Sequence, residues 1–193
     1  MARPRSEDKR DAILNAAIEV LAELGERAPT SKIAKLAGVA EGTLFTYFSS
    51  KEELLNQLYL SLKAELRQIM MLHYPLTADL KTQIHHVWQG YVNWGITTPQ
   101  KRKVIAQLST SEQITEQSKL IGMQSFCDMT TLIQTQIDQG LLRNYPPLFI
   151  GSMLGALADV TMNFMVQEPE NADRYRESGF EAFWHAVATP AKS

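Results

Sequence analysis

Acidic, hydroxyl and small residues gather in one short segment, residues 41–47, with a spacing that suits contact with DNA. In a helix, hydroxyl groups on the outward face can donate to phosphates, and a threonine can reach a base edge or a thymine methyl. Lys51 follows at the start of the next predicted helix, where its charge and the helix dipole both favour a phosphate. We therefore predict a DNA-contacting face. Its outward residues are Glu41, Gly42, Thr43, Thr46 and Tyr47.

This segment is the second half of a predicted helix pair. Two short stretches, 31–37 and 41–48, have helical apolar spacing and meet at Gly38, where glycine adopts a left-handed backbone easily. Small Ala34 and Ala37 allow the close crossing of a helix-turn-helix, whose second helix enters the major groove. Most helix pairs with a glycine turn only pack together. Here the outward hydroxyls, the neighbouring aromatic residues and the charged start of the next helix favour DNA contact.

Charge and composition narrow the class of protein. The 193 residues carry 19 Lys and Arg against 21 Asp and Glu, a net charge of −2, which excludes a general nucleic-acid coat but allows a small contact patch. Residues 1–51 hold 8 basic and 7 acidic side chains, so a weak positive bias falls on Lys51 and on the N-terminal arm that holds Arg3 and Arg5. A single cysteine, no signal peptide and no apolar run near the roughly 18 residues of a membrane span predict a cytoplasmic protein with no membrane partner.

Apolar residues recur at helical spacing along nearly the whole chain, and strand-like alternation is nearly absent. The sequence therefore predicts an all-α fold. A three-helix head, residues 1–50, precedes a remainder, 51–193, made of a connecting helix and an all-helical body. The expected helices cover about 7–24, 31–37, 41–48, 51–72 and 79–94, one opening at Thr98-Pro99, a long one ending at Gly140, one of about twenty residues after Pro147, and 170–187.

Aromatic and methionine side chains recur on faces of the body helices. Trp88 and Tyr91 share a helical face with Ile84, and later helices add Met and Phe residues. Such faces either line a pocket for varied apolar ligands or form the core, which is the more common outcome. Asp159 lies in an apolar run, where an unpaired charge is costly. Either a partner satisfies this carboxylate or it faces a cavity and attracts a cationic ligand.

Gly151, Gly155 and Ala158 form a stripe of small residues on the helix after Pro147. In such a helix, small residues allow the close approach of another helix, either within the fold or across a dimer. A DNA-binding head of this size contacts only a half-site, so two heads are needed. The stripe is therefore a candidate dimer contact.

Residues 33–48 and the run Lys51-Glu52-Glu53-Leu54 closely resemble the N-terminal signature of the TetR family of transcriptional repressors, over about residues 8–56. The resemblance implies a homodimer, paired through its last two helices, that binds palindromic half-sites of a double-stranded DNA operator. It also implies release by a small hydrophobic or cationic effector, and it implies no cofactor. Whether such a protein represses or activates stays open.

One departure affects the DNA contacts. Many relatives carry a basic side chain where Glu41 or Thr46 stands, so affinity here would depend on Lys51 and the arm. The DNA-binding candidates are Thr30, Ser31, Glu41, Gly42, Thr43, Thr46, Tyr47, Lys51, Arg3 and Arg5.

Parts of the chain are also similar to the RamR-type multidrug-sensing branch of that family, namely the arm 2–9, Trp94-Gly95 and Ser111-Glu112. This resemblance places Tyr59, Trp88 and Asp159 at effector-facing positions, whereas Ile84, Gly151 and Leu154 differ from that branch and imply a different ligand range. With the apolar faces above, the ligand-binding candidates are Tyr59, Ile84, Trp88, Tyr91, Met123, Phe126, Leu154 and Asp159.

Other kinds of site find little support. No phosphate-binding loop, nucleophile elbow or pair of catalytic carboxylates occurs, so an enzyme is not expected. Adjacent His85 and His86 diverge on a helix and predict no metal site. Cys127 is expected to be an inert buried thiol rather than a redox sensor, and residues 101–103 a solvated basic face rather than a second DNA patch. The alternative function is that of a hydrophobic-ligand-binding protein with a vestigial DNA-binding head.

Overall fold

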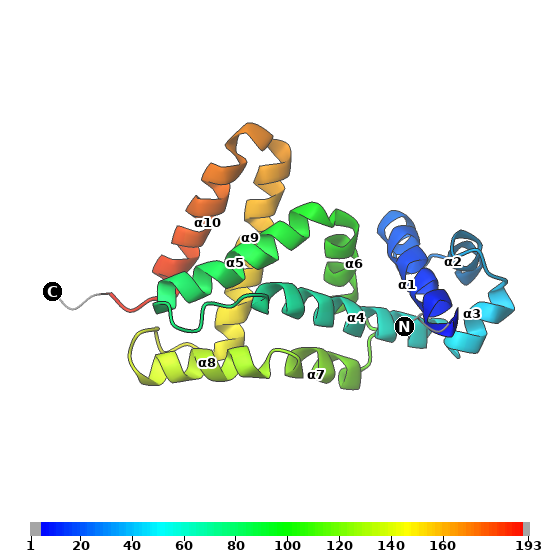
Figure 1. Ribbon diagram of the computed structural model, residues 1–193, viewed down its shortest axis with the longest axis horizontal. Helices are drawn as coiled ribbons and strands as arrows, with labels where there is room; N and C mark the ends of the chain where they lie inside the picture. Colours follow the sequence, from blue (N-terminus) through cyan, green and yellow to red (C-terminus); the bar gives the residue numbers. More distant parts are fainter. Residues whose placement is uncertain (1–4, 191–193) are drawn as a thin grey trace. The chain divides into compact units, whose positions relative to one another are not determined.

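The computed structural model describes residues 5–190, with side chains from residue 7 onward. Over that range the chain forms ten α-helices, one 3-10 turn and no named β-strand, which confirms the all-α expectation (Figure 1). The helices are α1 (Arg5–Leu24), α2 (Thr30–Leu36), α3 (Glu41–Tyr47), α4 (Lys51–Met71), α5 (Leu80–Thr97), α6 (Pro99–Ser109), α7 (Glu116–Gln124), α8 (Cys127–Asp138), α9 (Pro147–Gln167) and α10 (Ala172–Val187), with the 3-10 turn η1 at Pro169–Asn171.

The chain divides into two compact units. The first unit holds the described residues up to Glu65 together with Thr98–Met123, and so contains α1–α3, most of α4, α6 and nearly all of α7. The second unit holds Leu66–Thr97 and the described residues from Gln124 onward. The head shares its unit with α6 because α1 packs against that helix. The division into a head, 1–50, and a body therefore remains a functional prediction.

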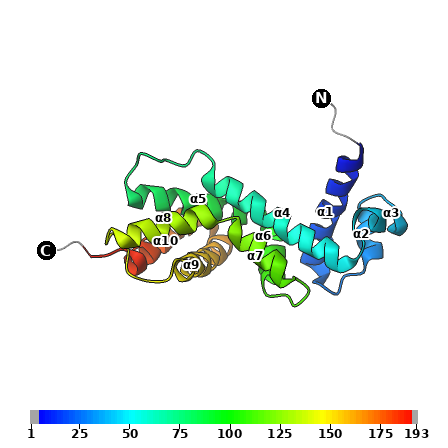
Figure 2. The ribbon, with the colours of Figure 1, turned by 90° about the horizontal axis from the view of Figure 1, so that it is seen from below.

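The head helices enclose a small apolar core at the predicted spacing. Ile33 and Ala34 of α2 are buried, as are Leu44 of α3 and Phe48, which follows α3. Gly38 has a φ of 69° and closes the turn between the two helices, a conformation that glycine adopts without strain. Figure 2 shows α2 and α3 side by side, in agreement with their direct packing. The predicted helix pair is thus present.

Polar side chains cap two of the long helices. Ser50 Oγ accepts a hydrogen bond of 3.0 Å from the backbone N–H of Glu53, and the Glu53 carboxylate accepts one of 2.7 Å from the backbone N–H of Ser49. Asp79 accepts a bond of 2.9 Å from the backbone N–H of Thr82 in the same way. These bonds satisfy N–H groups that have no partner inside a helix. They set the starts of α4 and α5 close to the predicted positions.

The long helix expected to end at Gly140 is instead two helices, α7 and α8. Phe126 leaves the helical conformation, with φ −111° and ψ 15°. Asp128 in the first turn of α8 pairs with Arg67 of α4, and an acidic residue there favours a new helix start. Cys127 begins α8 and is exposed, so the expectation of a buried thiol is wrong. Apolar spacing missed the break because the helical period resumes directly after it.

The core of the second unit lies between α5, α9 and α10 (Figure 1). Trp88 is fully buried, its indole N–H donates 3.1 Å to the backbone carbonyl of Arg176, and its ring stacks on Phe183 at an interplanar angle of 13°. A Cβ on Gly179 would lie 2.1 Å from Thr161 Oγ1, so only glycine permits this approach of α10 to α9. The arrangement is a closely packed core.

Helix α9 is more apolar than predicted from the sequence. Among the described helices it alone is long and apolar enough to cross a membrane by length and composition, and 28% of its apolar window is buried. The expectation that no segment approaches this length is therefore wrong for α9. Asp159 is its only charged residue, and the helix packs against α5, α8 and α10.

Candidate nucleic-acid interface

Four of the seven residues of helix α3 are exposed, as two pairs one helical turn apart. Leu44 is buried and faces α2, whereas Glu41, Gly42, Phe45 and Thr46 are exposed. Thr43 and Tyr47 are half-buried. The four exposed residues are related by i, i+4 spacing, which places Glu41 above Phe45 and Gly42 above Thr46 on neighbouring faces. The exposed face thus holds a carboxylate, a phenyl ring, a threonine and a glycine.

Two hydrogen bonds within the head orient this face. Thr30 Oγ1 donates to Glu41 Oε1 at 2.6 Å, so the first residue of α2 holds the first residue of α3. Thr46 Oγ1 donates to the carbonyl of Gly42 at 3.1 Å, which engages its hydroxyl within the helix. The structure therefore brings Thr30, Glu41, Gly42 and Thr46 together and engages side-chain groups that the prediction assigned to DNA. Their contact with DNA stays a prediction. Ser31 is exposed on α2.

The cations predicted to support DNA binding have varied surroundings. Lys51 is partly buried and its ammonium donates to the backbone carbonyl of Glu26, although an ammonium keeps further N–H donors for a phosphate. Arg10, on α1 just after the N-terminal arm, donates a hydrogen bond of 3.1 Å to Gln57 Oε1, and its guanidinium carbon lies 5.5 Å from the ring centroid of Phe48. Arg3 and the side chain of Arg5 lie outside the described residues. Lys51 and Arg10 thus both form hydrogen bonds between the head and α4 within the first unit.

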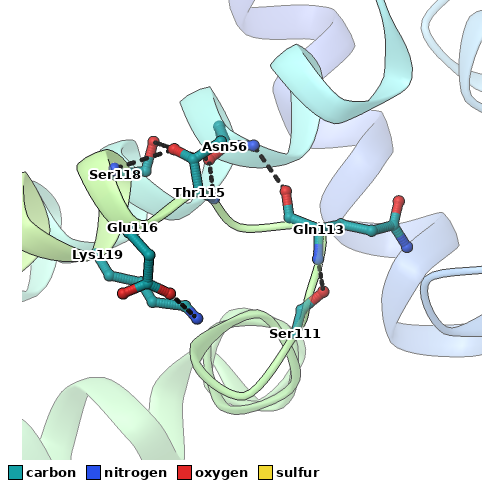
Figure 3. A network of polar contacts seen from close by, with 7 residues as sticks. All are labelled: Asn56, Ser111, Gln113, Thr115, Glu116, Ser118 and Lys119. Atoms are coloured by element: carbon teal, nitrogen blue, oxygen red, sulfur yellow. Dashed lines mark hydrogen bonds and ion pairs between the residues drawn. The ribbon is translucent and has the colours of Figure 1, made fainter.

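Sequence reasoning missed two features of this unit. Phe45 was not placed on the DNA face, although 42% of it is exposed. Its i+4 relation to Glu41 was the available signal. The second feature is a polar network below the head (Figure 3).

Asn56 is the centre of that network. Its amide donates to the carbonyl of Gln113 at 2.9 Å, and its carbonyl oxygen accepts from the backbone N–H of Thr115 at 2.9 Å (Figure 3). Thr115 in turn caps α7 by accepting from the Ser118 backbone N–H at 3.1 Å. The Glu26 carboxylate, from the turn after α1, accepts from the side chains of Ser111 and Gln113. The network joins the α1–α2 turn, α4 and the segment before α7 within one unit.

The predicted ligand-binding residues fall in both units. In the second unit, Trp88 belongs to the core, with Ile84, Tyr91 and Leu154 packed against the same cluster. The structure thus brings these four together, and it places Trp88 where the core interpretation of the aromatic face expects it. Asp159 is partly exposed and takes part in a polar or electrostatic interaction. Its position toward a ligand cavity stays a prediction.

The remaining candidates have different environments. Tyr59 is buried, and a Cβ on Gly122 would lie 2.8 Å from its ring, so α7 lies directly on this tyrosine. Met123 is largely exposed, and Phe126 stands at the break before α8. Lys101 of the basic run pairs with Glu65 at 2.6 Å, which supports a role in the surface of its own unit.

Comparison with known proteins gives sequence matches to the head and structural matches to nearly the whole chain. Residues 13–58 match the family model described as bacterial regulatory proteins, tetR family. The fatty acid metabolism regulator protein of Bacillus subtilis (strain 168) is 52% identical over 48 residues, which cover 24% of this chain and 25% of that protein. The chain's match thus spans about a quarter of the length of that curated relative.

Solved structures match over nearly the whole fold. A Shewanella sp. PV-4 protein assigned to the tetR family of transcription regulators is 28% identical with a TM-score of 0.86, covering 94% of this chain and 99% of that one. A TetR family transcription regulator from Marinobacter aquaeolei VT8 has a TM-score of 0.89 at 22% identity, over 98% and 100% of the two chains. FadR from Bacillus subtilis, solved in complex with stearoyl-CoA, has a TM-score of 0.72 at 23% identity, over 90% and 96%. The last two matches show a shared fold.

Proposed function

We propose that this chain, which is similar to the TetR family over residues 13–58 and in its fold, is a DNA-binding transcriptional regulator whose head recognises an operator. The observation that carries the proposal is the exposed face of α3. Buried side chains hold α3 against α2, and hydrogen bonds within the head orient its exposed side chains. A rigid helix with small and polar groups outward is what major-groove docking requires. We place the protein in the cytoplasm, with no catalytic role.

The proposed regulator acts as a homodimer through α9 and α10. Small residues on α9 support this assembly, because a Cβ on Gly151 or Gly155 would have no neighbour within 4 Å. A second helix could therefore approach closely there. Five large apolar side chains of α9 are also exposed and available for burial against a second copy: Leu148, Phe149, Val160, Phe164 and Val166.

Footprinting tests the proposed function. The full-length protein is added to the DNA upstream of its own gene, and the protected segment is mapped. We expect two protected half-sites about one helical turn, roughly 34 Å, apart. The alternative function, a ligand-binding protein with a vestigial head, predicts ligand binding without a footprint on any genomic fragment. That result with folded protein would overturn the proposal.

The effector we propose first is a small apolar or cationic molecule that releases the operator by favouring a different spacing of the two heads. Thermal-shift measurements with a lipophilic cation such as tetraphenylphosphonium test the cationic form. The expected result is a raised melting temperature together with loss of the footprint. An unchanged melting temperature at saturating cation would contradict the cationic form.

A fatty acyl thioester is the second candidate effector. Burial raises the pKa of Tyr59 and the charge of Lys119 partly lowers it, while Lys63 lies 5.5 Å from the centroid of the same ring. Lys63 and Lys119, of which Lys119 also pairs with Glu116 at 2.9 Å, place two cations near one buried phenol, and this charge favours an anionic head group. The Bacillus subtilis FadR structure was solved with stearoyl-CoA, a molecule of that kind. Stearoyl-CoA should then raise the melting temperature of the wild type more than that of Lys63→Gln, with Lys35→Gln as control.

A further inference from the structure

We propose that α3 recognises its half-site through thymine methyl groups and one cytosine amino group, and makes no guanine contact of its own. The inference rests on the proposed function, since it specifies what the DNA-contacting face recognises. Its basis is the set of groups that α3 exposes, Glu41, Phe45 and Thr46, and the hydrogen bonds that hold them.

Helix α3 lacks the side chains that usually contact purines. In the major groove, guanine is recognised by Arg or Lys, and adenine by Asn or Gln. The seven residues of α3 include none of these four types. The nearby cations Lys32 and Lys35 lie on α2, the helix that crosses the DNA backbone in this motif, and Lys51 is bonded to Glu26. Helix α3 itself therefore supplies none of the side chains that usually recognise purines.

Phe45 and Thr46 supply apolar contacts. The Thr46 hydroxyl donates its proton to the carbonyl of Gly42, so it offers no hydrogen-bond donor to a base, and its methyl is free for an apolar contact. The Phe45 ring is 42% exposed on the adjoining position. A phenyl ring and a threonine methyl are the side-chain groups that contact the C5-methyl of thymine in the major groove. Two apolar groups on neighbouring faces of α3 thus favour a thymine-containing step.

Glu41 supplies the polar contact. A carboxylate accepts from the N4 amino group of cytosine, the base that Glu and Asp usually contact in the major groove. Thr30 holds Oε1 of this carboxylate at 2.6 Å and fixes the side chain before DNA arrives, which lowers the entropy lost on binding. Oε2 is then left as the acceptor for a base. A carboxylate is repelled by phosphates, so a base is the partner that its position on the exposed face favours.

The test begins with selection of binding sites from a random duplex library by the full-length protein. Each thymine of the selected half-site is then replaced by deoxyuridine, which removes only the methyl group. We expect a loss of about fivefold to tenfold in wild-type affinity at one or two positions, and less than about twofold for Phe45→Ala at the same positions. Leu24→Ala, an exposed apolar residue of α1, should keep the wild-type sensitivity.

The cytosine contact has its own specificity readout. Glu41→Gln should change the preference at one position from C toward A, because Gln pairs with adenine, and Thr30→Val should weaken the preference for C without reversing it. Glu23→Gln on α1 is the matched charge control and should leave the selected sequence unchanged. If a site is selected but Glu41→Gln and Phe45→Ala keep the same base preferences, the inference is overturned and the proposed function stands. If folded protein selects no site, the proposed function is overturned.

Discussion

Thr30 and Gly42 decide what the side chains of α3 can offer to a partner. Thr30 engages one carboxylate oxygen of Glu41, and the carbonyl of Gly42 engages the hydroxyl of Thr46. Thr46, for which the sequence left both a base edge and a thymine methyl open, thus has its hydroxyl proton engaged and its methyl free. Side-chain bonds to the preceding turn are common for threonine in helices. At the scale of a residue, the local backbone therefore selects which half of an amphipathic side chain is exposed.

Removing Tyr47 or Lys51 should weaken operator binding in different ways. Tyr47→Ala deletes a phenol that can donate to a phosphate, and we expect about a fivefold loss of affinity that hardly depends on salt. Lys51→Ala should cost about tenfold and lower the slope of log affinity against log salt by about 1. Gel shifts across a salt series measure both effects. Lys103→Ala, exposed on α6, is the control, and unchanged affinity for both test variants would contradict the assignment.

Ser49 should control part of the pH dependence of stability. Its hydroxyl and backbone N–H both donate to Glu53, and these bonds hold the pKa of Glu53 below its ordinary value of 4.5. A carboxyl group with a lowered pKa stabilises the fold above the unfolded pKa and loses that contribution as the pH falls through the folded pKa. The free energy of unfolding should thus decline as the pH falls below 4.5, and less steeply in Ser49→Ala. Urea titrations measure this, and parallel profiles would refute it.

At the scale of an element, the position of α4 depends on a buried amide. Asn56→Ala should leave the carbonyl of Gln113 and the backbone N–H of Thr115 without this partner. We expect a loss of about 2–3 kcal/mol in the free energy of unfolding. Ser61→Ala, exposed on the same helix, should change it by less than about 0.5 kcal/mol. Equal urea midpoints for the two variants would show that the network contributes no stability.

Helix α10 also depends on a close approach at Gly179. A Cβ on Gly179 would lie 2.1 Å from Thr161 Oγ1 and 2.9 Å from Trp88 Cζ2. Although alanine is the better helix former, Gly179→Ala should destabilise the second unit by about 1–3 kcal/mol or more, because neither neighbour can move within the core. Ser178→Ala, an exposed neighbour on α10, should be close to neutral. Thermal unfolding of the two variants makes the comparison, and a stabilised Gly179→Ala would contradict the packing.

The elements differ in how far the sequence predicted them. Helical apolar spacing predicted the head helices that bury Leu44 and Phe48, and it placed the starts of α4 and α5 near residues 51 and 79, because this signal is local. The break before α8 was missed because a two-residue interruption leaves the period intact. The contacts of Lys51 and Asn56 were missed for another reason. Their partners, Glu26 and Gln113, are distant in sequence, and only the folded unit brings them together.

At the scale of the whole molecule, one head of this size forms few base contacts. Two linked heads convert the second half-site contact into an intramolecular step, which raises overall affinity by about 10²–10⁴. The proposed dimer is therefore a condition of operator recognition. An interface on α9 also explains why its most apolar side chains stay exposed in a single chain: burial against a second copy would remove them from water.

A double substitution tests that interface. Val160 and Phe164 are 54% and 45% exposed and one helical turn apart, so Val160→Glu with Phe164→Glu should leave the chain folded while placing two charges in the proposed interface. We expect sedimentation as a 21.7 kDa monomer and an operator affinity about 100-fold lower. Leu76→Glu, 81% exposed before α5, should remain a dimer with wild-type affinity. A dimer that survives both glutamates would place the interface elsewhere, and a wild-type monomer at micromolar concentration would contradict the dimer itself.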